Sequence, residues 1–324
     1  MPAGFGPIAG LKIGHAQDEA ALTGCTVFVC EQGMVAACEV LGGAVGEREL
    51  ETLRPGHIVE RIHGLVLVGG SAFGLDAASG VMRWCEERGV GFDAGVVRVP
   101  IVPSAILFDL AVGSATRRPD AAMGYAAAQA AVEGPVEEGN AGAGTGATVG
   151  KLFGIERAIK AGIGCWTEEL PGGVRVAALA VVNAFSDIRE PETGRIIAGA
   201  RAAADSMEFV DTAAAMRRGP EAPGVRAGFS GTNTVLVVVA TDASLTKMEA
   251  QRVAGTASEG MARTVSPAFT KFDGDIVFAL SLGDKKADVD AVGAAAAEAV
   301  ARAIVRGVTE ARTAGGVPGL KGRE

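Results

Sequence analysis

The amino-acid sequence predicts one large domain of the α+β class, covering residues 1–324, in which helices and strands form layers. Three observations support this fold class. Of the 324 residues, 48% are apolar and 21% are charged, which suits a globular chain long enough to bury a large core. The C-terminal half alternates strands and helices without a break in composition or a low-complexity linker. Gly numbers 47 and aromatic residues make up only 5%, so we expect an aliphatic core with close backbone approaches.

Short strands interrupted by Gly are expected in the N-terminal part, where brief apolar runs alternate with turn-forming residues. These strands cover residues 11–13, 26–29, 35–40 and 64–68. Residues 74–89 are expected to form a helix that Gly89 closes at its C′ position. The Ala-rich residues 120–132 are expected to form a second helix.

The second half of the chain is expected to continue with strands and helices. The β-branched run 234–240 has no polar alternation after Thr234, which predicts a strand buried on both faces. Residues 246–249 (TKME) fit a capping box that opens a helix to about Thr264. The remaining expected elements are strands at 174–182 and 275–282, helices at 198–218 and 288–312, a loop at 219–233 and a loose tail over the last dozen residues.

Charge and composition exclude several classes of protein. The net charge is −8 and Lys and Arg form no cluster, so no nucleic-acid partner is expected. No apolar run approaches the ~20 residues that cross a bilayer, and the first residues do not resemble a secretory signal. We therefore expect no membrane contact and a cytoplasmic location. The five cysteines form no CxxC pair, so neither a disulfide framework nor a metal site is indicated.

The most glycine-dense stretch, 139–150, ends directly before Lys151. A phosphate-binding loop needs G-x-x-x-x-G-K-[ST], but Thr145 stands at the place of the first Gly and Leu152 at the place of the hydroxyl residue. Nucleotide binding is therefore not predicted. The stretch is either a flexible loop with close backbone packing, or a site where its amides and Lys151 bind an anionic or carbonyl oxygen.

A serine in the turn 69–73 (GGSAF) is the next candidate nucleophile. A nucleophile elbow needs G-x-S-x-G, but Phe73 stands where the second Gly belongs. The three histidines, at positions 15, 57 and 63, all precede Ser71, whereas a triad in hydrolase order needs a later one. A Ser-His-Asp triad is therefore not predicted, and the histidines are expected to be surface or structural residues.

A hydrolase without a late histidine needs another general base, and the α-amino group of a chain terminus is one. Its free pKa of about 7.7–8.0 lies near the pH at which a general base works best. A Thr exposed by chain cleavage carries this amine and a hydroxyl nucleophile on one residue. Thr234 fits, since it follows Asn233 at the end of a loop and begins the buried strand. The position equally suits an ordinary β-branched residue that starts a strand after a turn.

Seven segments taken together resemble one known family. They are GGAVGERE (42–49), LVGGSAFGLDAASGV (67–81), VPIVPSAILFDL (99–110), AGAGTGATVGK (141–151), AVVN (180–183), TNTVLVVVATDA (232–243) and FDGDIVFAL (272–280). In this order they resemble the DmpA-type aminopeptidases (L-aminopeptidase/D-esterase), a self-processing family of N-terminal-nucleophile hydrolases that includes the nylon-oligomer hydrolases. The resemblance runs from Ile13 to Ala311. It implies a four-layer αββα sandwich of the DmpA/ornithine-acetyltransferase type.

The resemblance also implies a set of site residues. Members of the family cut their own chain just before the nucleophile, which here places the cut between Asn233 and Thr234 and gives fragments 1–233 and 234–324. Thr234 would then be the nucleophile and its new α-amine the base. The other catalytic residues that the resemblance implies are Lys151 after the Gly-rich loop, Asn183 as an oxyanion-hole amide, and Asp273 and Asp275 as an acidic pair beside the nucleophile.

The substrate pocket is expected to include Ser71, Phe73 and Gly144. Relatives often have Tyr where Phe73 stands, so a hydroxyl contact to substrate is missing here. Phe269 stands where relatives often have His, and some relatives use Ser in place of Thr as the nucleophile. These differences leave the implied mechanism intact and leave the substrate open.

The resemblance predicts a cofactor-free aminopeptidase or amidase that acts on short peptides or on amino-acid amides and esters. One alternative is a hydrolase of amide oligomers such as 6-aminohexanoate chains. A second is an uncleaved, non-catalytic binding module, and a third is acyl transfer to an amine instead of to water. Relatives assemble as homo-oligomers, commonly tetramers, so a homo-oligomer of cleaved protomers is expected.

Overall fold

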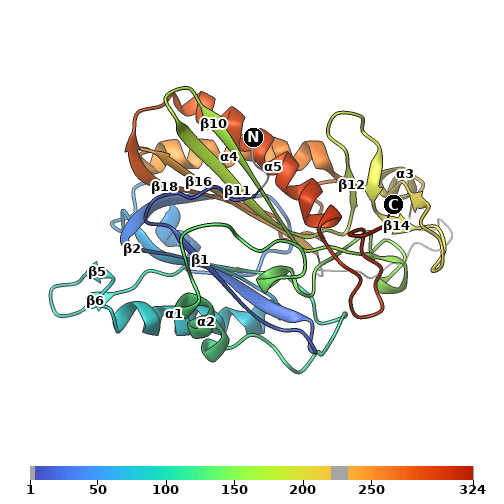
Figure 1. Cartoon of the computed structure of the whole chain (residues 1–324), viewed down its shortest axis with the longest axis horizontal. Coiled ribbons are helices and arrows are strands. Elements are labelled where there is room, and N and C mark those ends of the chain that lie inside the picture. Colours follow the sequence, from blue (N-terminus) through green and yellow to red (C-terminus); the bar gives the residue numbers. More distant parts are fainter. Residues whose placement is uncertain (1–3, 220–232, 324) are drawn as a thin grey trace.

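The computed structural model describes residues 4–219 and 233–323, and its centre is a mixed nine-stranded sheet with helices on its outer faces (Figure 1). The strand order is β10-β11-β16-β18-β2-β4-β7-β3, and β1 pairs with β2 outside this path. The strands of this sheet are β1 (Lys12–Asp18), β2 (Thr23–Val40), β3 (Glu47–Arg48), β4 (Ile62–Val68), β7 (Ser104–Ile106), β10 (Ile163–Leu170), β11 (Val174–Asn183), β16 (Thr234–Ala243) and β18 (Ile276–Lys285). The predicted α+β class is confirmed.

Five α-helices and several short elements complete the described part of the chain. The helices are α1 (Ala77–Glu86), α2 (Ala121–Gln129), α3 (Thr212–Arg217), α4 (Lys247–Thr264) and α5 (Val289–Thr309). The short strands are β5 (Phe92–Asp93), β6 (Arg98–Val99), β8 (Thr148–Val149), β9 (Ile159–Lys160), β12 (Asp187–Arg189), β13 (Ile196–Ala198), β14 (Ala200–Arg201), β15 (Phe209–Val210) and β17 (Val265–Ser266). The 3₁₀ turns are η1 (Leu50–Leu53), η2 (Ser71–Asp76), η3 (Gly142–Gly144) and η4 (Ile155–Arg157).

The long strand β2 divides the sheet into two halves. Residues 23–29 pair with β1, and most of them also with β4, whereas residues 35–40 pair with β18. The register shifts between the two parts, where Gly33 has a φ of +75°, so a bulge lets one strand change partners. The separate strands predicted at 26–29 and 35–40 are therefore parts of one strand, which is a correction to the sequence analysis.

Three hydrophobic clusters hold the layers together. The first lies between the two halves of the sheet, where Phe28 and Leu67 from one half pack in the same cluster as Leu179 and Phe278 from the other. The second lies between β11, β16 and the helices α4 and α5. The third joins α1 and α2 to the half formed by β1, β2 and β4. Helices therefore cover both outer faces of the paired sheet halves (Figure 1).

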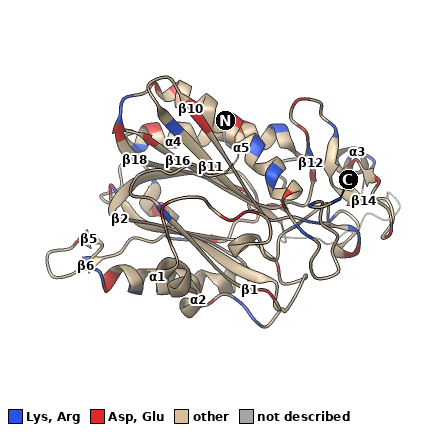
Figure 2. Ribbon diagram, viewed as in Figure 1, with Lys and Arg blue, Asp and Glu red and all other residues tan. Residues whose placement is uncertain are grey.

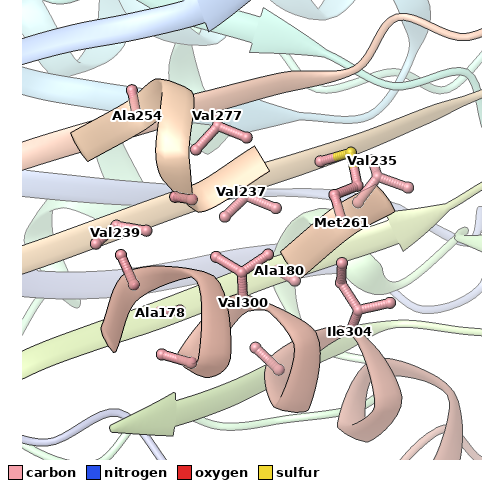
Figure 3. Packing of buried hydrophobic residues seen from close by; sticks show 14 of the residues in the cluster. Ala178, Ala180, Val235, Val237, Val239, Ala254, Met261, Val277, Val300 and Ile304 are labelled. Atoms are coloured by element: carbon pink, nitrogen blue, oxygen red, sulfur yellow. The ribbon is translucent and has the colours of Figure 1, made fainter. Parts of the chain in front are cut away.

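Alternate side chains of strand β16 belong to two of these clusters. Leu236 and Val238 belong to the cluster between the sheet halves, while Val235, Val237 and Val239 pack with α4 and α5 (Figure 3). Successive side chains of a strand point to opposite faces, so an unbroken apolar run fills both sides. The predicted strand with two buried faces is confirmed.

The capping box predicted at the start of α4 is also present. The Thr246 hydroxyl accepts a hydrogen bond from Glu249 N at 3.3 Å, and the Glu249 carboxylate accepts one from Thr246 N at 2.7 Å. These two bonds satisfy amide groups that the first helical turn leaves without a partner.

The helix predicted over 198–218 is wrong. Only α3 is helical there, and β14 pairs with β15 instead. Alanine favours helices, but the buried Asp187 carboxylate accepts hydrogen bonds from Ala200 N at 3.4 Å and from Thr212 N at 2.7 Å. Because these tertiary contacts hold both ends of the segment, one continuous helix cannot form. Most of the loop predicted at 219–233 lies outside the described residues.

The prediction of a loose tail at the C-terminus is wrong as well. Pro318 O accepts a hydrogen bond from Lys160 N at 2.8 Å, and Ala311 O accepts one from Lys321 N at 3.0 Å. Val317 is buried beside them. The tail therefore folds back onto the domain because its carbonyl and aliphatic groups find partners there.

Charged residues lie mainly on the helices and loops. Figure 2 shows the strands of the central sheet largely free of charge, with Lys and Arg interspersed among Asp and Glu along α5. Within residues 4–219 and 233–323, no helix has the length and apolar character needed to cross a membrane.

Candidate functional site

Strand pairing brings Thr234 to the same place as Asn183 and the two aspartates. Thr234 begins β16 and lies directly opposite Asn183, the last residue of the antiparallel strand β11. On its other side β16 runs parallel to β18, and Asn233 bridges to Asp273 just before that strand. Opposite residues in an antiparallel pair point to the same face of the sheet. The Thr234 and Asn183 side chains therefore share one face.

The Thr234 hydroxyl lies against the peptide bond that precedes it. Thr234 is only 2% exposed, and its Oγ1 donates a hydrogen bond to the Asn233 carbonyl oxygen at 2.5 Å. The Gly274 N–H donates to the same oxygen at 2.8 Å. Two donors thus polarise the Asn233 carbonyl beside a buried hydroxyl.

Lys151 fixes the orientation of the Asn183 amide. Lys151 Nζ donates to both the Asn183 carbonyl oxygen and Oδ1, each at 2.8 Å, and Thr148 N donates to Oδ1 at 3.1 Å. Asn183 Nδ2 donates to Phe108 O at 3.1 Å. With Oδ1 held by two donors, the amide nitrogen presents its N–H groups on the opposite side, and its second N–H can donate to a ligand.

Burial governs the charge of Lys151. Desolvation lowers the pKa of Lys151 to about 7, while Asp273 and Asp109 act in the opposite direction. A lysine with such a pKa changes charge near neutral pH, unlike an exposed one. Lys151 is therefore suited to influence protonation of a nearby group around the pH at which a general base works.

The two aspartates frame the start of β16. Asp275 Oδ1 accepts a hydrogen bond from Val235 N at 2.7 Å and Oδ2 one from Phe269 N at 3.3 Å. Asp273 accepts hydrogen bonds from the Thr270 hydroxyl at 2.5 Å and Phe185 N at 3.5 Å. Burial and the neighbouring Asp273 raise the pKa of Asp275 to about 7, and burial also raises the pKa of Asp273.

The residues expected in the substrate pocket occupy different environments. Ser71 has a φ of +55° and its N–H donates to Leu107 O at 3.0 Å, next to the Phe108 carbonyl that Asn183 reaches. Phe73 is 59% exposed, and the Arg118 guanidinium packs over its ring at 3.7 Å. Gly144 is buried in the Gly-rich loop. A pocket role for these three residues stays a prediction.

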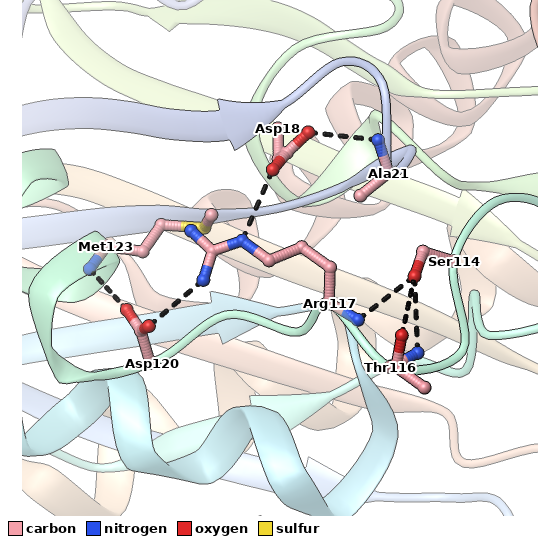
Figure 4. Close-up of polar contacts among 7 residues, drawn as sticks. All are labelled: Asp18, Ala21, Ser114, Thr116, Arg117, Asp120 and Met123. Carbon is pink, nitrogen blue, oxygen red and sulfur yellow. Dashed lines mark hydrogen bonds and ion pairs between the residues drawn. The ribbon is translucent and has the colours of Figure 1, made fainter.

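The loop that carries Arg118 is anchored by its neighbour Arg117 (Figure 4). Arg117 donates to Asp18 at the end of β1 and to Asp120, both at 3.2 Å. Asp120 in turn caps α2 by accepting from Met123 N at 2.9 Å, and Ser114 Oγ accepts from Arg117 N at 3.1 Å. These bonds hold the loop beside the turn that contains Phe73.

No group of three or more His, Cys, Asp or Glu side chains could hold a metal ion within the described residues. The polar groups around Thr234 come instead from hydroxyl, amide, ammonium and carboxyl side chains. Such a set can supply a nucleophile, an oxyanion donor and charged partners for an amine.

Comparison with known proteins decides the family. Residues 7–321 match the profile of peptidase family S58. The chain belongs to peptidase family S58. The predicted DmpA-type membership is thus confirmed, and with it the class of enzyme, a hydrolase that acts on peptide bonds.

Named relatives of this S58 peptidase fall into two groups. An uncharacterized aminopeptidase of Mycobacterium tuberculosis is 39% identical over 96% of this chain and 95% of its own. A 6-aminohexanoate-oligomer endohydrolase of Kocuria sp. is 31% identical over 84% of this chain and 73% of its own. The protein is therefore similar to both an aminopeptidase and an amide-oligomer hydrolase.

Solved structures agree on the fold of the S58 peptidase. A Burkholderia sp. beta-aminopeptidase matches with a TM-score of 0.70 and 25% identity, covering 99% of this chain and 92% of that one. The L-aminopeptidase D-Ala-esterase/amidase of Ochrobactrum anthropi matches with a TM-score of 0.70 and 19% identity, covering 96% and 88%. The latter is described as a variant of the N-terminal-nucleophile hydrolase fold, and this chain shares that fold.

Several groups at the site of the S58 peptidase were missed by the sequence analysis. They are the Gly274 and Thr148 amides, the Phe108 carbonyl, Asp109 and Lys160. The backbone groups leave no signal in a sequence. Asp109 and Lys160 did leave a signal in the sequence, because each is a single charged residue within an apolar run or at its end.

The raised pKa of Asp275 predicts a specific pH dependence of stability. Between its ordinary value of 3.8 and about 7, the folded state keeps a proton that the unfolded state has lost. Stability therefore falls as pH rises through this window. The test compares two proteins in urea unfolding, the Thr234→Ala variant and the same variant that also carries Asp275→Asn. We expect the free energy of unfolding of the double variant, relative to that of the Thr234→Ala variant, to increase between pH 5 and pH 8.

The control for this prediction is Asp18→Asn. Hydrogen bonds to Ala21 and Arg117 lower the pKa of Asp18, so this carboxylate is ionised throughout the window. Its effect on the free energy of unfolding should be the same at pH 5 and pH 8. A constant difference for Asp275→Asn as well would show that Asp275 does not take up a proton on folding.

Proposed function

We propose that the protein is a self-processing N-terminal-nucleophile amide hydrolase whose nucleophile is Thr234. One observation carries the proposal: the buried Thr234 hydroxyl lies 2.5 Å from the carbonyl oxygen of Asn233 and opposite Asn183. We propose that the helices and the two sheet halves form the four-layer αββα sandwich of such enzymes. We also propose that catalysis needs no cofactor. The products of cleavage would be residues 1–233 and 234–324.

Self-processing begins in the intact chain. Thr234 Oγ1 attacks the Asn233 carbonyl carbon, and the developing oxyanion is stabilised by the Gly274 N–H that already donates to this oxygen. The C–N bond breaks as the Thr234 nitrogen takes the proton from Oγ1, which leaves an ester. Water hydrolyses this ester to a carboxylate on Asn233 and a free α-amine and hydroxyl on Thr234.

Gly274→Ala tests this step. A Cβ at Gly274 would lie 2.9 Å from Thr234 Oγ1 and 2.9 Å from Ala44 O, so the hydroxyl or the turn has to move. We expect conversion of the full-length chain into two fragments to slow by at least about tenfold, measured by timed denaturing electrophoresis.

Gly255→Ala is the matched control, because Gly255 lies in the middle of α4 and a Cβ there meets nothing within 4 Å. It should leave the cleavage rate unchanged. Cleavage of Gly274→Ala at the rate of the Gly255→Ala protein would contradict the role given to the Gly274 turn.

Turnover uses the same groups after cleavage. The α-amine of Thr234 accepts the Oγ1 proton as Oγ1 attacks the substrate carbonyl, and the second N–H of Asn183 binds the oxyanion. The amine product leaves with that proton, and water then releases the acid from the acyl-enzyme. Lys151 disfavours a second positive charge on the α-amine, while Asp273 and Asp275 balance the charge of the site.

The proposed substrates are short peptides and amino-acid amides or esters, with 6-aminohexanoate oligomers as the alternative. The M. tuberculosis relative supports the first and the Kocuria relative the second. A turnover panel of aminoacyl-p-nitroanilides and 6-aminohexanoate oligomers separates them, and an added amine acceptor reveals any acyl transfer. A chain that stays intact and hydrolyses nothing in the panel would instead favour a binding module.

We further propose that cleaved protomers form a cytoplasmic homo-oligomer, a tetramer as the resemblance implies. Exposed apolar side chains such as Val96, Ile58 and Met248 are available for such contacts. Light scattering after size-exclusion chromatography measures the oligomeric state directly.

A further inference from the structure

Two buried charged residues next to the site have no part in the mechanism described so far. Lys160 is fully buried, and its Nζ donates to three carbonyl oxygens, those of Ala161 at 2.6 Å, Ala147 at 2.8 Å and Gly144 at 3.2 Å. None of these acceptors is charged. Burying an ammonium group without a carboxylate contact is costly, and burial lowers the pKa of Lys160, which lies on β9, to about 7.

Asp109 lies against Gly146 of the same loop, and burial raises the pKa of its carboxyl group. It is 2% exposed, and its carboxylate accepts hydrogen bonds from Thr23 Oγ1 at 2.6 Å and Gly70 N at 2.7 Å. A Cβ on Gly69 would fall 2.1 Å from Asp109 Oδ2, and one on Gly146 would fall 2.6 Å from Asp109 Cβ. The side chain is thus wedged between the turn at 69–71 and the Gly-rich loop.

The loop that these two residues hold leads directly to the site. Four residues after Ala147, Lys151 Nζ contacts Asn183, and between them Thr148 N donates to Asn183 Oδ1. Lys160 is paired with Thr148 across β8 and β9. Movement of the Gly-rich loop would therefore move both groups that orient the Asn183 amide.

Asp109 and Lys160 also act on the site through their charge. The charged groups that act on Lys151 are Asp273 after β17, Asp109 after β7 and Lys160 on β9, and Asp273 in turn acts on Asp275. Asp109 favours the protonated form of Lys151, whereas Lys160 disfavours it. The same signs apply to any other amine at this place, including a new α-amine on Thr234.

We propose that Asp109 and Lys160 are positioning residues of the amide hydrolase, which hold the Gly-rich loop at Gly146 and at the Gly144 and Ala147 carbonyls and act on the amines beside Asn183. This inference rests on the proposed function. It requires that the two residues act through Lys151 and the α-amine without touching substrate. Removal of either charge should then shift the pH dependence of turnover, in opposite directions.

Asp109→Asn is the first test, because the amide keeps the size of the side chain and can still accept from Gly70 N. We expect the acid limb of the pH profile of kcat/KM to move to lower pH by about half a unit to one unit, since a negative charge near the base is lost. Lys160→Met removes a positive charge and should move this limb to higher pH. Acid limbs that stay at the wild-type pH, or that both move the same way, would overturn the proposal.

Two controls separate charge from structure. Thr23→Val removes a hydrogen bond that lowers the pKa of Asp109 but keeps the carboxyl group, so any movement of the limb should be smaller than in Asp109→Asn. Lys160→Arg is positively charged at every pH of the profile, so it should not move the limb to higher pH as Lys160→Met does. If Lys160→Met does not fold, the pH profiles of the two single variants Asp109→Asn and Lys160→Arg, each compared with that of the wild type, still test the proposal.

Turnover of Thr234→Ala distinguishes this inference from the proposed function. If Thr234→Ala keeps its turnover, the proposed function fails regardless of Asp109. If Thr234→Ala is inactive and the limb of Asp109→Asn stays at the wild-type pH, only the role of Asp109 and Lys160 fails.

Discussion

Replacing Thr234 by Ala is expected to leave the chain in one piece and to lower turnover by at least about 10³-fold, because the nucleophile is lost. The change removes only a hydroxyl and a methyl group from a buried strand end. Thr234→Ser keeps the hydroxyl and should still cleave and turn over. Intact mass and hydrolysis of an aminoacyl-p-nitroanilide measure the two effects separately.

Thr241→Ala is the matched control for this variant. Thr241 lies on the same strand, is equally buried, and donates its hydroxyl to a backbone carbonyl, that of Arg175, at 2.7 Å. It should lose stability comparable to Thr234→Ala but remain cleaved and active. Turnover by Thr234→Ala within tenfold of Thr241→Ala would refute Thr234 as the nucleophile.

Asn183→Ala is expected to lower kcat by about 10²–10³-fold with a smaller change in KM, as for loss of an oxyanion-hole donor. The side chain has its orientation fixed by Lys151 and Thr148, so little reorganisation is needed when charge develops on the substrate oxygen. Steady-state kinetics on purified, fully cleaved protein measure kcat and KM separately.

The control for the asparagine is Gln251→Ala. Gln251 also uses its amide, donating from Nε2 to Glu39 Oε2 at 2.8 Å, but it lies on α4, outside the Gly-rich loop and the strand ends that carry the site. It should leave kcat unchanged. A kcat for Asn183→Ala within threefold of wild type would show that Asn183 does not bind the oxyanion.

The sequence predicted the strand at 234–240 and the capping box of α4 correctly because each depends on local chemistry. An apolar run without alternation has to be buried on both faces, and Thr246 with Glu249 satisfies its own helix start. The helix predicted at 198–218 failed for the opposite reason. Its alanines favour a helix locally, but the distant Asp187 binds the chain at Ala200 and Thr212.

The candidate site shows the same division. Thr234, Asn183 and Asp275 were predicted through the resemblance of short segments, and strand register explains why residues so far apart in the sequence meet. The Gly274 amide could not be predicted, because any residue except Pro carries a backbone N–H. Its position beside the Asn233 carbonyl depends on the turn before β18 and becomes visible only in the folded chain.

The central claim is that the protein makes its own catalytic amine by cutting one peptide bond. Intact mass spectrometry combined with N-terminal sequencing of the purified protein tests this claim most directly. We expect two polypeptides, residues 1–233 and 234–324, with the second beginning Thr-Val-Leu. A single intact chain after long incubation, or a new N-terminus at any other residue, would contradict it.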